Sequence, residues 1–127
     1  MIQPKRLLIM FNRPKPFRIC ILSTLNNTIL TLTDQDGKVK AWNSAGSSGF
    51  RGARRATSYA AQQAGELLAK KSRTLGTRIV TVELKGFGPG RDASVKGLKV
   101  GGLSIQKIED CTGIPHNGCR APKKRRL

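Results

Sequence analysis

The sequence predicts one α/β domain at residues 17–111, built on a mixed five-stranded sheet with helices packed on it. Two patterns support this fold class. Three strand-like runs follow one another in the first half, separated by short turns, as in an antiparallel meander. Strand and helix patterns alternate in the second half, which favours parallel strands joined by right-handed crossovers. We expect an extended basic arm at residues 1–16 and an extended basic tail at residues 112–127.

The first three strands are expected between residues 17 and 43. Residues 17–25 (FRICILSTL) are almost continuously apolar, which is typical of a strand buried on both faces. After a tight turn of two asparagines, residues 28–33 (TILTLT) alternate β-branched and apolar side chains, as the partner strand of a hairpin does. Residues 38–43 (KVKAWN) then alternate as a half-exposed strand does.

A loop of small residues and a long helix open the second half. The loop at residues 44–52 (SAGSSGFRG) leads to a helix that Thr57 is expected to cap and Gly76 to end. The helix face that we expect to be buried carries Ala56, Ala60, Ala64, Leu67 and Leu68.

The remaining elements complete the alternation of strands and helices. Residues 78–84 (RIVTVEL) predict a fourth strand, and residues 103–109 (LSIQKIE) predict a fifth. Between them, the loop GFGPG leads to a short helix from Asp92 to about Gly101, with Val95 and Leu98 facing inward.

The charge of the chain predicts an anionic partner. Lysine and arginine number 24 against 7 acidic residues, a net charge of +17, and self-repulsion of this size opposes the compact state. A membrane surface would call for a basic amphipathic helix, whereas these cations concentrate in predicted loops and ends, so nucleic acid is favoured. Because aromatic residues make up 5% of the chain, we expect recognition of RNA shape and backbone rather than sequence-specific stacking.

The N-terminal residues and the cysteines indicate the class of compartment. Residues 1–16 contain three prolines, which favour an extended arm over the amphipathic helix of a transit peptide. The apolar run at residues 7–11 is too short to span a bilayer. Three cysteines without a CxxC spacing favour reduced thiols in an intracellular or organellar matrix over disulfides or zinc.

Two glycine-containing loops have the composition of phosphate-binding segments. GFGPGRD has glycines before a helix N-terminus, but it lacks the spacing of GxGxxG and the lysine of a P-loop. It can be a tight turn, a nucleotide site or, as the charge favours, a contact with nucleic-acid phosphates flanked by Lys85 and Arg91. Phe87 can stack on a base or pack against the protein. SGFRG, followed by Arg54 and Arg55, permits close backbone approach and bidentate phosphate binding.

The tail sequence CTGIPHNGCRAPKKRRL has no helix or strand period. Pro115 and Pro122 exclude an ordinary helix or strand interior, and an Asn-Gly turn lies between them. Five cations follow within the last eight positions. The tail is therefore either a disordered solubilising segment or an extended arm laid along nucleic acid.

Catalysis is not expected. A meander followed by parallel strands is typical of a ribonuclease H-like topology, and nucleases of that architecture need clustered carboxylates that hold two metal ions. Here the first strand has no acid and the acids are scattered, while His116 is the single histidine. We predict no catalytic residues, metal, cofactor or small-molecule substrate.

The motif IPHNGCRxPKKRR closely resembles the end of the universal small-subunit ribosomal protein number eleven family. NNTI, GSSGFRG and GPGR resemble the same family in the same order, so the resemblance extends over about residues 17–127. It implies a structural constituent of the small ribosomal subunit that binds small-subunit rRNA on the platform, near the exit site and the mRNA exit. The implied neighbours are other platform proteins and a head protein across the mRNA path.

The resemblance and the charge together predict a set of rRNA-facing residues. They are Asn26, Asn27, Thr28, Phe50, Arg51, Gly52, Arg54, Arg55, Lys85, Gly88, Gly90, Arg91, His116, Asn117, Gly118, Arg120, Lys123, Lys124, Arg125 and Arg126.

Departures from the family pattern bear on the compartment. Family members often have proline at the positions of Phe87, Gly113 and Ala121, and many bacterial members have a denser basic arm. These differences favour an organellar matrix, mitochondrial rather than plastid, with the bacterial cytoplasm as the alternative. The alternative functions are a free-standing basic RNA-binding or RNA-chaperone protein and a nucleotide-binding enzyme that uses GFGPGRD.

Overall fold

The structure, a computed structural model, describes residues 16–127, so the predicted basic arm lies outside the described residues except for Pro16. The strands are β1 (Phe17–Ser23), β2 (Thr28–Thr33), β3 (Val39–Ser44), β4 (Ile79–Lys85) and β5 (Ser104–Asp110). The helices are the 3-10 helix η1 (Gly52–Ala56) and the α-helices α2 (Ser58–Thr74) and α3 (Arg91–Val100). No helix of this part of the chain combines the length and the apolar composition needed to cross a bilayer.

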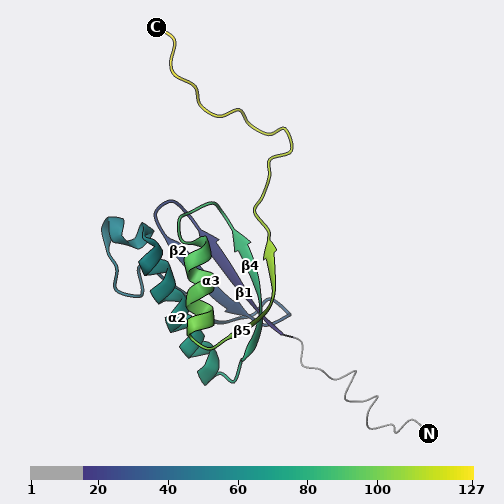
Figure 1. Cartoon of the computed structure of the whole chain (residues 1–127). Helices are drawn as coiled ribbons and strands as arrows, with labels where there is room; N and C mark the ends of the chain where they lie inside the picture. The colour runs from purple at the N-terminus through teal and green to yellow at the C-terminus, as the bar shows by residue number, and fades with distance from the viewer. Residues whose placement is uncertain (1–15) are drawn as a thin grey trace, which may run out of the picture.

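The five strands form one mixed sheet in the order β3-β2-β1-β4-β5 (Figure 1). β1 pairs antiparallel with β2, and β2 pairs antiparallel with β3. β1 pairs parallel with β4, and β4 pairs parallel with β5. The structure confirms the predicted α/β class and the mixed five-stranded sheet, and its strand order is consistent with the predicted ribonuclease H-like topology.

The core lies between the sheet and the two α-helices, which pack on the same face (Figure 1). At the sheet centre, Ile19 of β1 pairs with Leu32 of β2 and Val82 of β4, and all three side chains are fully buried. Leu68 of α2 and Leu98 of α3 close over this face. Burial of these aliphatic side chains is the main favourable term in folding, at roughly 1.5–3 kcal/mol for each.

The prediction that the first strand is buried on both faces is wrong. The residues of β1 alternate in burial: Ile19 and Ile21 are buried, whereas Arg18 is exposed and Leu22 is 43% exposed. The reason is tertiary, because both helices pack on one face and, among the described residues, no element covers the other. A continuous apolar run cannot report which face of its sheet will be covered.

The predicted cap of the long helix is confirmed, but its predicted buried face needs correction. The hydroxyl oxygen of Thr57 accepts a hydrogen bond from the backbone N–H of Ala60 at 3.3 Å. Ala56 belongs to η1, and Leu67 is 37% exposed. Ala60, Ala64 and Leu68 are buried as predicted. The rest of the buried face carries small residues, and Gly65 is one of them, because α3 crosses α2 closely there.

Glycines set the distance between the two α-helices. A Cβ atom on Gly65 would lie 2.6 Å from the carbonyl oxygen of Ser94, and one on Gly97 would overlap the backbone of Gln62. Residues with side chains at these two positions would push the helices apart.

We expect Gly97→Ala to destabilise the fold by about 1–3 kcal/mol, because the added methyl group meets backbone atoms that cannot move aside. Helix propensity alone would give a gain of about 1 kcal/mol for the same change. Urea unfolding followed by circular dichroism measures the difference. Gly113→Ala is the matched control, since a Cβ atom there meets nothing within 4 Å. Unchanged or increased stability of Gly97→Ala would contradict the close helix crossing.

The open face of the sheet carries a charged cluster around Cys20. The Nε atom of Arg18 lies 3.1 Å from a carboxylate oxygen of Glu83, and the thiol of Cys20 donates to the same carboxylate at 3.7 Å. Burial raises the pKa of the Cys20 thiol, and the Glu83 carboxylate raises it further because a second negative charge disfavours the thiolate.

At pH 7.5, iodoacetamide should therefore modify the exposed Cys119 several-fold faster than Cys20, because the thiolate is the reacting species. Glu83→Gln should speed the labelling of Cys20 and leave that of Cys119 unchanged. Mass spectrometry of peptides from timed samples gives both rates, and labelling in urea provides the unfolded reference. A Cys20 rate that does not respond to Glu83→Gln would rule out the carboxylate as a cause.

Candidate nucleic-acid interface

Two predicted RNA-facing segments meet at one edge of the sheet, and the tail begins there. β1 and β4 are parallel, so their carboxyl ends lie side by side, and the tail leaves β5 at the same edge (Figure 1). The backbone N–H of Gly88 donates to the carbonyl oxygen of Ser23 at 3.2 Å, which ties the two loops together. We call the surface formed by residues 24–28, 85–91 and 110–113 the carboxyl edge.

The turn between β1 and β2 is held by its own side chains. The N–H of Asn27 donates to the hydroxyl oxygen of Thr24 at 3.0 Å, and the Asn27 side-chain oxygen accepts from the N–H of Thr28 at 2.9 Å. Asn26 is exposed, whereas Thr28 is only 2% exposed. Of the three residues predicted to face RNA, Asn26 is thus the most accessible, and the other two shape the turn.

The glycines of the loop at residues 86–90 are required by packing within the chain. Cβ atoms on Gly86 and Gly88 would overlap the carbonyl oxygens of Ser23 and Thr24. A Cβ atom on Gly90 would overlap the Thr28 hydroxyl and the methyl group of Ala61. Gly88 and Gly90 are buried, so they bring the loop against the neighbouring turn rather than present their own surface.

Arg91 braces the carboxyl edge. Its guanidinium donates to the carbonyl oxygen of Gly86 at 2.7 Å and to the carboxylate of Asp110 at 3.0 Å. Asp110 also accepts from the hydroxyl of Thr112 at 2.6 Å. The Thr112 hydroxyl, followed by Arg91, lowers the pKa of Asp110 to about 2. The side chain of Arg91, which the sequence predicts to face rRNA, is therefore committed largely to this brace.

Phe87 points out of the same loop. It is 78% exposed, so it is not packed in the core of the chain. The guanidinium carbon of Arg91 lies 5.7 Å from the centroid of its ring, within the range of a cation–π contact. Lys85, which is predicted to face rRNA, lies beside this loop at the end of β4 and is exposed.

The fourth predicted segment, residues 50–55, precedes α2, and the first residue of α2 contacts the carboxyl edge. The hydroxyl of Ser58 donates to the carbonyl oxygen of Pro89 at 3.3 Å. A pocket of about 390 Å³ is lined by Gly49, Phe50, Arg51 and Arg54.

Two arginines of this segment are exposed and one is partly committed. Arg51 and Arg54 are exposed, whereas Arg55 is half-buried and its Nε donates to the carbonyl oxygen of Gly52 at 3.4 Å. The rings of Phe50 and Tyr59 meet edge to face, with centroids 5.7 Å apart, which orients Phe50.

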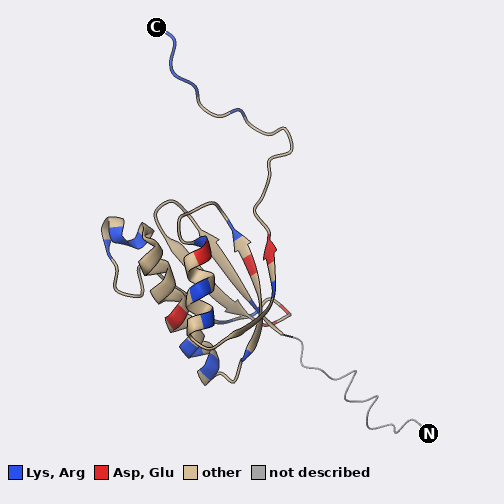
Figure 2. Ribbon diagram, in the orientation of Figure 1, with Lys and Arg blue, Asp and Glu red and all other residues tan. Residues whose placement is uncertain are grey.

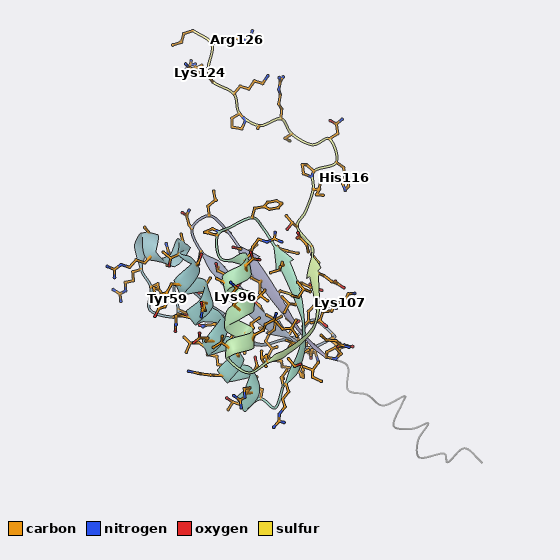
Figure 3. All side chains as sticks on the ribbon, in the orientation of Figure 1. Tyr59, Lys96, Lys107, His116, Lys124 and Arg126 are labelled. Carbon is orange, nitrogen blue, oxygen red and sulfur yellow. The ribbon has the colours of Figure 1, made fainter. Side chains whose placement is uncertain are left out.

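The tail is accessible along its length. Asn117 has a φ of 57°, as expected at a turn of the predicted Asn-Gly type. Figure 3 shows that His116, Lys124 and Arg126 lie on the extended segment beyond the domain. The predicted rRNA-facing residues of the tail are all exposed: His116, Asn117, Gly118, Arg120, Lys123, Lys124, Arg125 and Arg126.

The charges are unevenly distributed. Figure 2 shows lysine and arginine on η1, near the end of α2, on α3 and along the tail, whereas the acids are spread over both α-helices, β4, β5 and the turn between β2 and β3. In the described part of the chain, the ion pairs involve Arg18, Lys40, Arg91 and Lys107. Arg51, Arg54 and the cations of the tail are thus left for an external anion.

One group of side chains has the composition of a metal site. Ligand atoms of Glu83, Glu109 and Cys111 lie within 4.8 Å of one another on neighbouring strands. This group was not predicted, because the acids are scattered along the sequence. The pairing of β4 with β5 brings the two glutamates together. Glu83 already binds Arg18 and Glu109 binds Lys107, so cations of the chain itself neutralise the carboxylates.

Asp110, Thr112 and Tyr59 were not predicted from the sequence. The sequence offers only a weak indication that Asp110 is part of the site: it follows Glu109, and adjacent acids stand out in a chain with only 7 of them. The sequence gives no indication of the role of Tyr59, because the spacing between Phe50 and Tyr59 does not correspond to neighbouring positions on one helix. Their roles depend on contacts between separate elements.

Comparison with known proteins identifies the family. The model for the family "Ribosomal protein S11" matches residues 18–126. Small ribosomal subunit protein uS11m of Marchantia polymorpha is 55% identical over 105 residues, which cover 83% of this chain and 84% of the relative. Small ribosomal subunit protein uS11c of Oltmannsiellopsis viridis is 51% identical over 107 residues, covering 84% and 83%. Small ribosomal subunit protein uS11 of Solibacter usitatus is 50% identical over 107 residues, covering 84% and 79%.

The family model covers the carboxyl edge, the start of α2 and nearly all of the tail, and the matches confirm the resemblance seen in the sequence motifs. The chain therefore belongs to the ribosomal protein S11 family, whose members are structural components of the ribosome rather than enzymes.

Proposed function

We propose that the chain is a structural constituent of the small ribosomal subunit and binds small-subunit rRNA on the platform, near the exit site and the mRNA exit. The observation that carries the proposal is the convergence of the predicted RNA-facing segments on one side of the domain, with exposed cations on η1 and the tail. The names of the relatives support the assignment to the small subunit.

In the proposed mechanism, the carboxyl edge fits the shape of the RNA, and the exposed cations and the tail bind its phosphates. Buried residues such as Gly88 and Thr28 hold the carboxyl edge in one shape. Exposed cations such as Arg51, Arg54 and Lys85 bind phosphates and release the counterions condensed on the RNA. The tail follows the folded RNA surface beyond the domain. Binding in this way reads RNA shape and backbone more than base identity.

Protein neighbours have a suitable surface on the open face of the sheet. Leu22, Ile29 and Trp42 are exposed there, on three adjacent strands. Apolar side chains on an uncovered sheet face are suited to contact with another protein. We assign this face to neighbouring platform proteins, with the head protein and the mRNA nearer the tail.

The nucleotide-binding alternative loses its main support in the structure. The glycines of GFGPG are occupied by packing against the β1–β2 turn, which accounts for them without a phosphate ligand. The exposed cations fit both a ribosomal protein and a free-standing RNA-binding or RNA-chaperone protein, and sedimentation with small subunits distinguishes the two.

Replacing Lys123, Lys124, Arg125 and Arg126 with alanine should weaken rRNA binding and flatten its salt dependence. The slope of log K against log salt should fall by up to about 0.7–0.9 for each phosphate that the tail no longer neutralises. Filter binding with purified small-subunit rRNA at several salt concentrations measures this slope. The matched control replaces four exposed cations of the helices, Lys70, Arg73, Lys96 and Lys99.

The control variant removes the same charge from a surface that we do not assign to RNA, so its slope should change much less. Equal slopes for the wild-type protein and the tail variant would mean that the tail is only solvated.

A tagged copy with its native start should remain with small subunits through a sucrose gradient at moderate salt, because many phosphate and shape contacts hold it. A free-standing RNA chaperone would be stripped from the subunits under these conditions. Sequencing of RNA crosslinked in cells should then show a few small-subunit rRNA segments rather than many messages.

The same gradient tests the compartment. We propose a mitochondrial ribosome, in line with the departures from the family pattern, and the mitochondrial relative supports this placement. Extracts of purified mitochondria, plastids and cytosol should yield the tagged protein in the mitochondrial small subunits. Co-sedimentation with cytosolic ribosomes alone would contradict the proposed compartment.

A further inference from the structure

Phe87 is an exposed aromatic residue on an anchored loop. The loop is tied to β1 by the hydrogen bond from Gly88 to Ser23, and to the start of the tail by one from the Gly86 N–H to the Thr112 hydroxyl, at 3.2 Å. Packing of both glycines against the β1–β2 turn leaves the segment no room to shift toward the sheet. The ring is thus held outward at a defined place, and ordering it on binding costs little entropy.

Arg91 occupies one side of this ring. Its guanidinium lies 5.7 Å from the ring centroid, and its hydrogen bonds to Gly86 and Asp110 keep it there. The side chain of Arg91 is 22% exposed, so the guanidinium stays packed beside the ring and does not extend into solvent. The ring, 78% exposed, keeps the rest of its surface for a ligand.

The surroundings of the ring favour a nucleobase as that ligand. A base offers a flat π-face to the ring and a phosphate to a nearby cation. Lys85 provides such a cation in the same loop region, and Asn26 adds polar groups on the neighbouring turn. Leu25, 79% exposed on that turn, adds apolar surface for the edge of a base.

The other aromatic residues described in the structure are placed differently. Phe17 packs against the core, Phe50 and Tyr59 contact each other, and Trp42 lies on the sheet face. At the carboxyl edge, Phe87 is therefore the aromatic side chain positioned to take a base.

We propose that Phe87, backed by Arg91, is a stacking platform for one unpaired base of the small-subunit rRNA. This inference rests on the proposed binding of rRNA at the carboxyl edge, and it adds a base contact to an interface otherwise built on phosphates. The base lies on the open surface of the ring, and its phosphate reaches Lys85.

The arrangement of cleavage sites allows a direct test. Trypsin cuts after Lys85 and Arg91, which releases residues 86–91 (GFGPGR) as a peptide with Phe87 as its one aromatic residue. Cells expressing the full chain are irradiated at 254 nm, small subunits are purified and digested, and peptides are analysed by mass spectrometry. We expect this peptide to carry a nucleotide on Phe87.

Two variants separate stacking from apolar contact. Phe87→Tyr keeps an aromatic ring and should keep the nucleotide adduct, whereas Phe87→Leu keeps apolar bulk and should lose it. Phe87→Leu should also bind purified small-subunit rRNA about tenfold more weakly, as expected when one base stack is removed. Its salt slope should stay unchanged because no charge is removed. Because the ring is exposed, equal urea midpoints will show that both variants fold.

The outcomes distinguish this inference from the proposed function. Adducts on tail peptides without one on residues 86–91, together with an unchanged affinity of Phe87→Leu, would overturn the platform and leave rRNA binding intact. A crosslink from Phe87 to a peptide of another protein would also overturn it. A protein that never associates with the small subunit would overturn both proposals.

Discussion

Parallel pairing of β1 with β4 organises the whole domain. It joins the antiparallel meander to the strand–helix half of the chain, and it places the carboxyl ends of both strands at one edge. Parallel pairing requires a long connection, here made of β2, β3, η1 and α2, and its last part brings α2 across the sheet. The buried pair of Ile19 and Val82 at its centre favours this register over a slip by one residue.

Small residues have a structural rather than a flexible role in this chain. Gly65 and Gly97 allow the two helices to cross closely, and Gly86 and Gly88 seat one loop against another. Each is needed because a backbone atom from a distant segment occupies the place of its Cβ atom. The rigid carboxyl edge that results can present a ring and a few cations in fixed positions, which lowers the entropy cost of binding.

Charge is separated from the folded core. The acids lie largely in ion pairs and turns, as between Asp110 and Arg91, whereas Arg51, Arg54 and the cations of the tail remain exposed to solvent. A net charge of +17 opposes compaction, and projecting part of it into the tail reduces that repulsion within the domain. The same arrangement leaves the charge accessible to an anionic partner. Exposed cations in the tail therefore favour both folding of the domain and binding of that partner.

The fold class, the order of the elements and the Thr57 cap could be predicted from the sequence alone, and its net charge predicts an anionic partner. These properties depend on local periodicity, on turn residues and on total charge, which are all visible along the chain. Tertiary structure decided which face of β1 is covered, why the loop at residues 86–90 needs its glycines, and that Phe87 points outward beside Arg91. Those outcomes depend on contacts between segments far apart in sequence, and no local pattern encodes them.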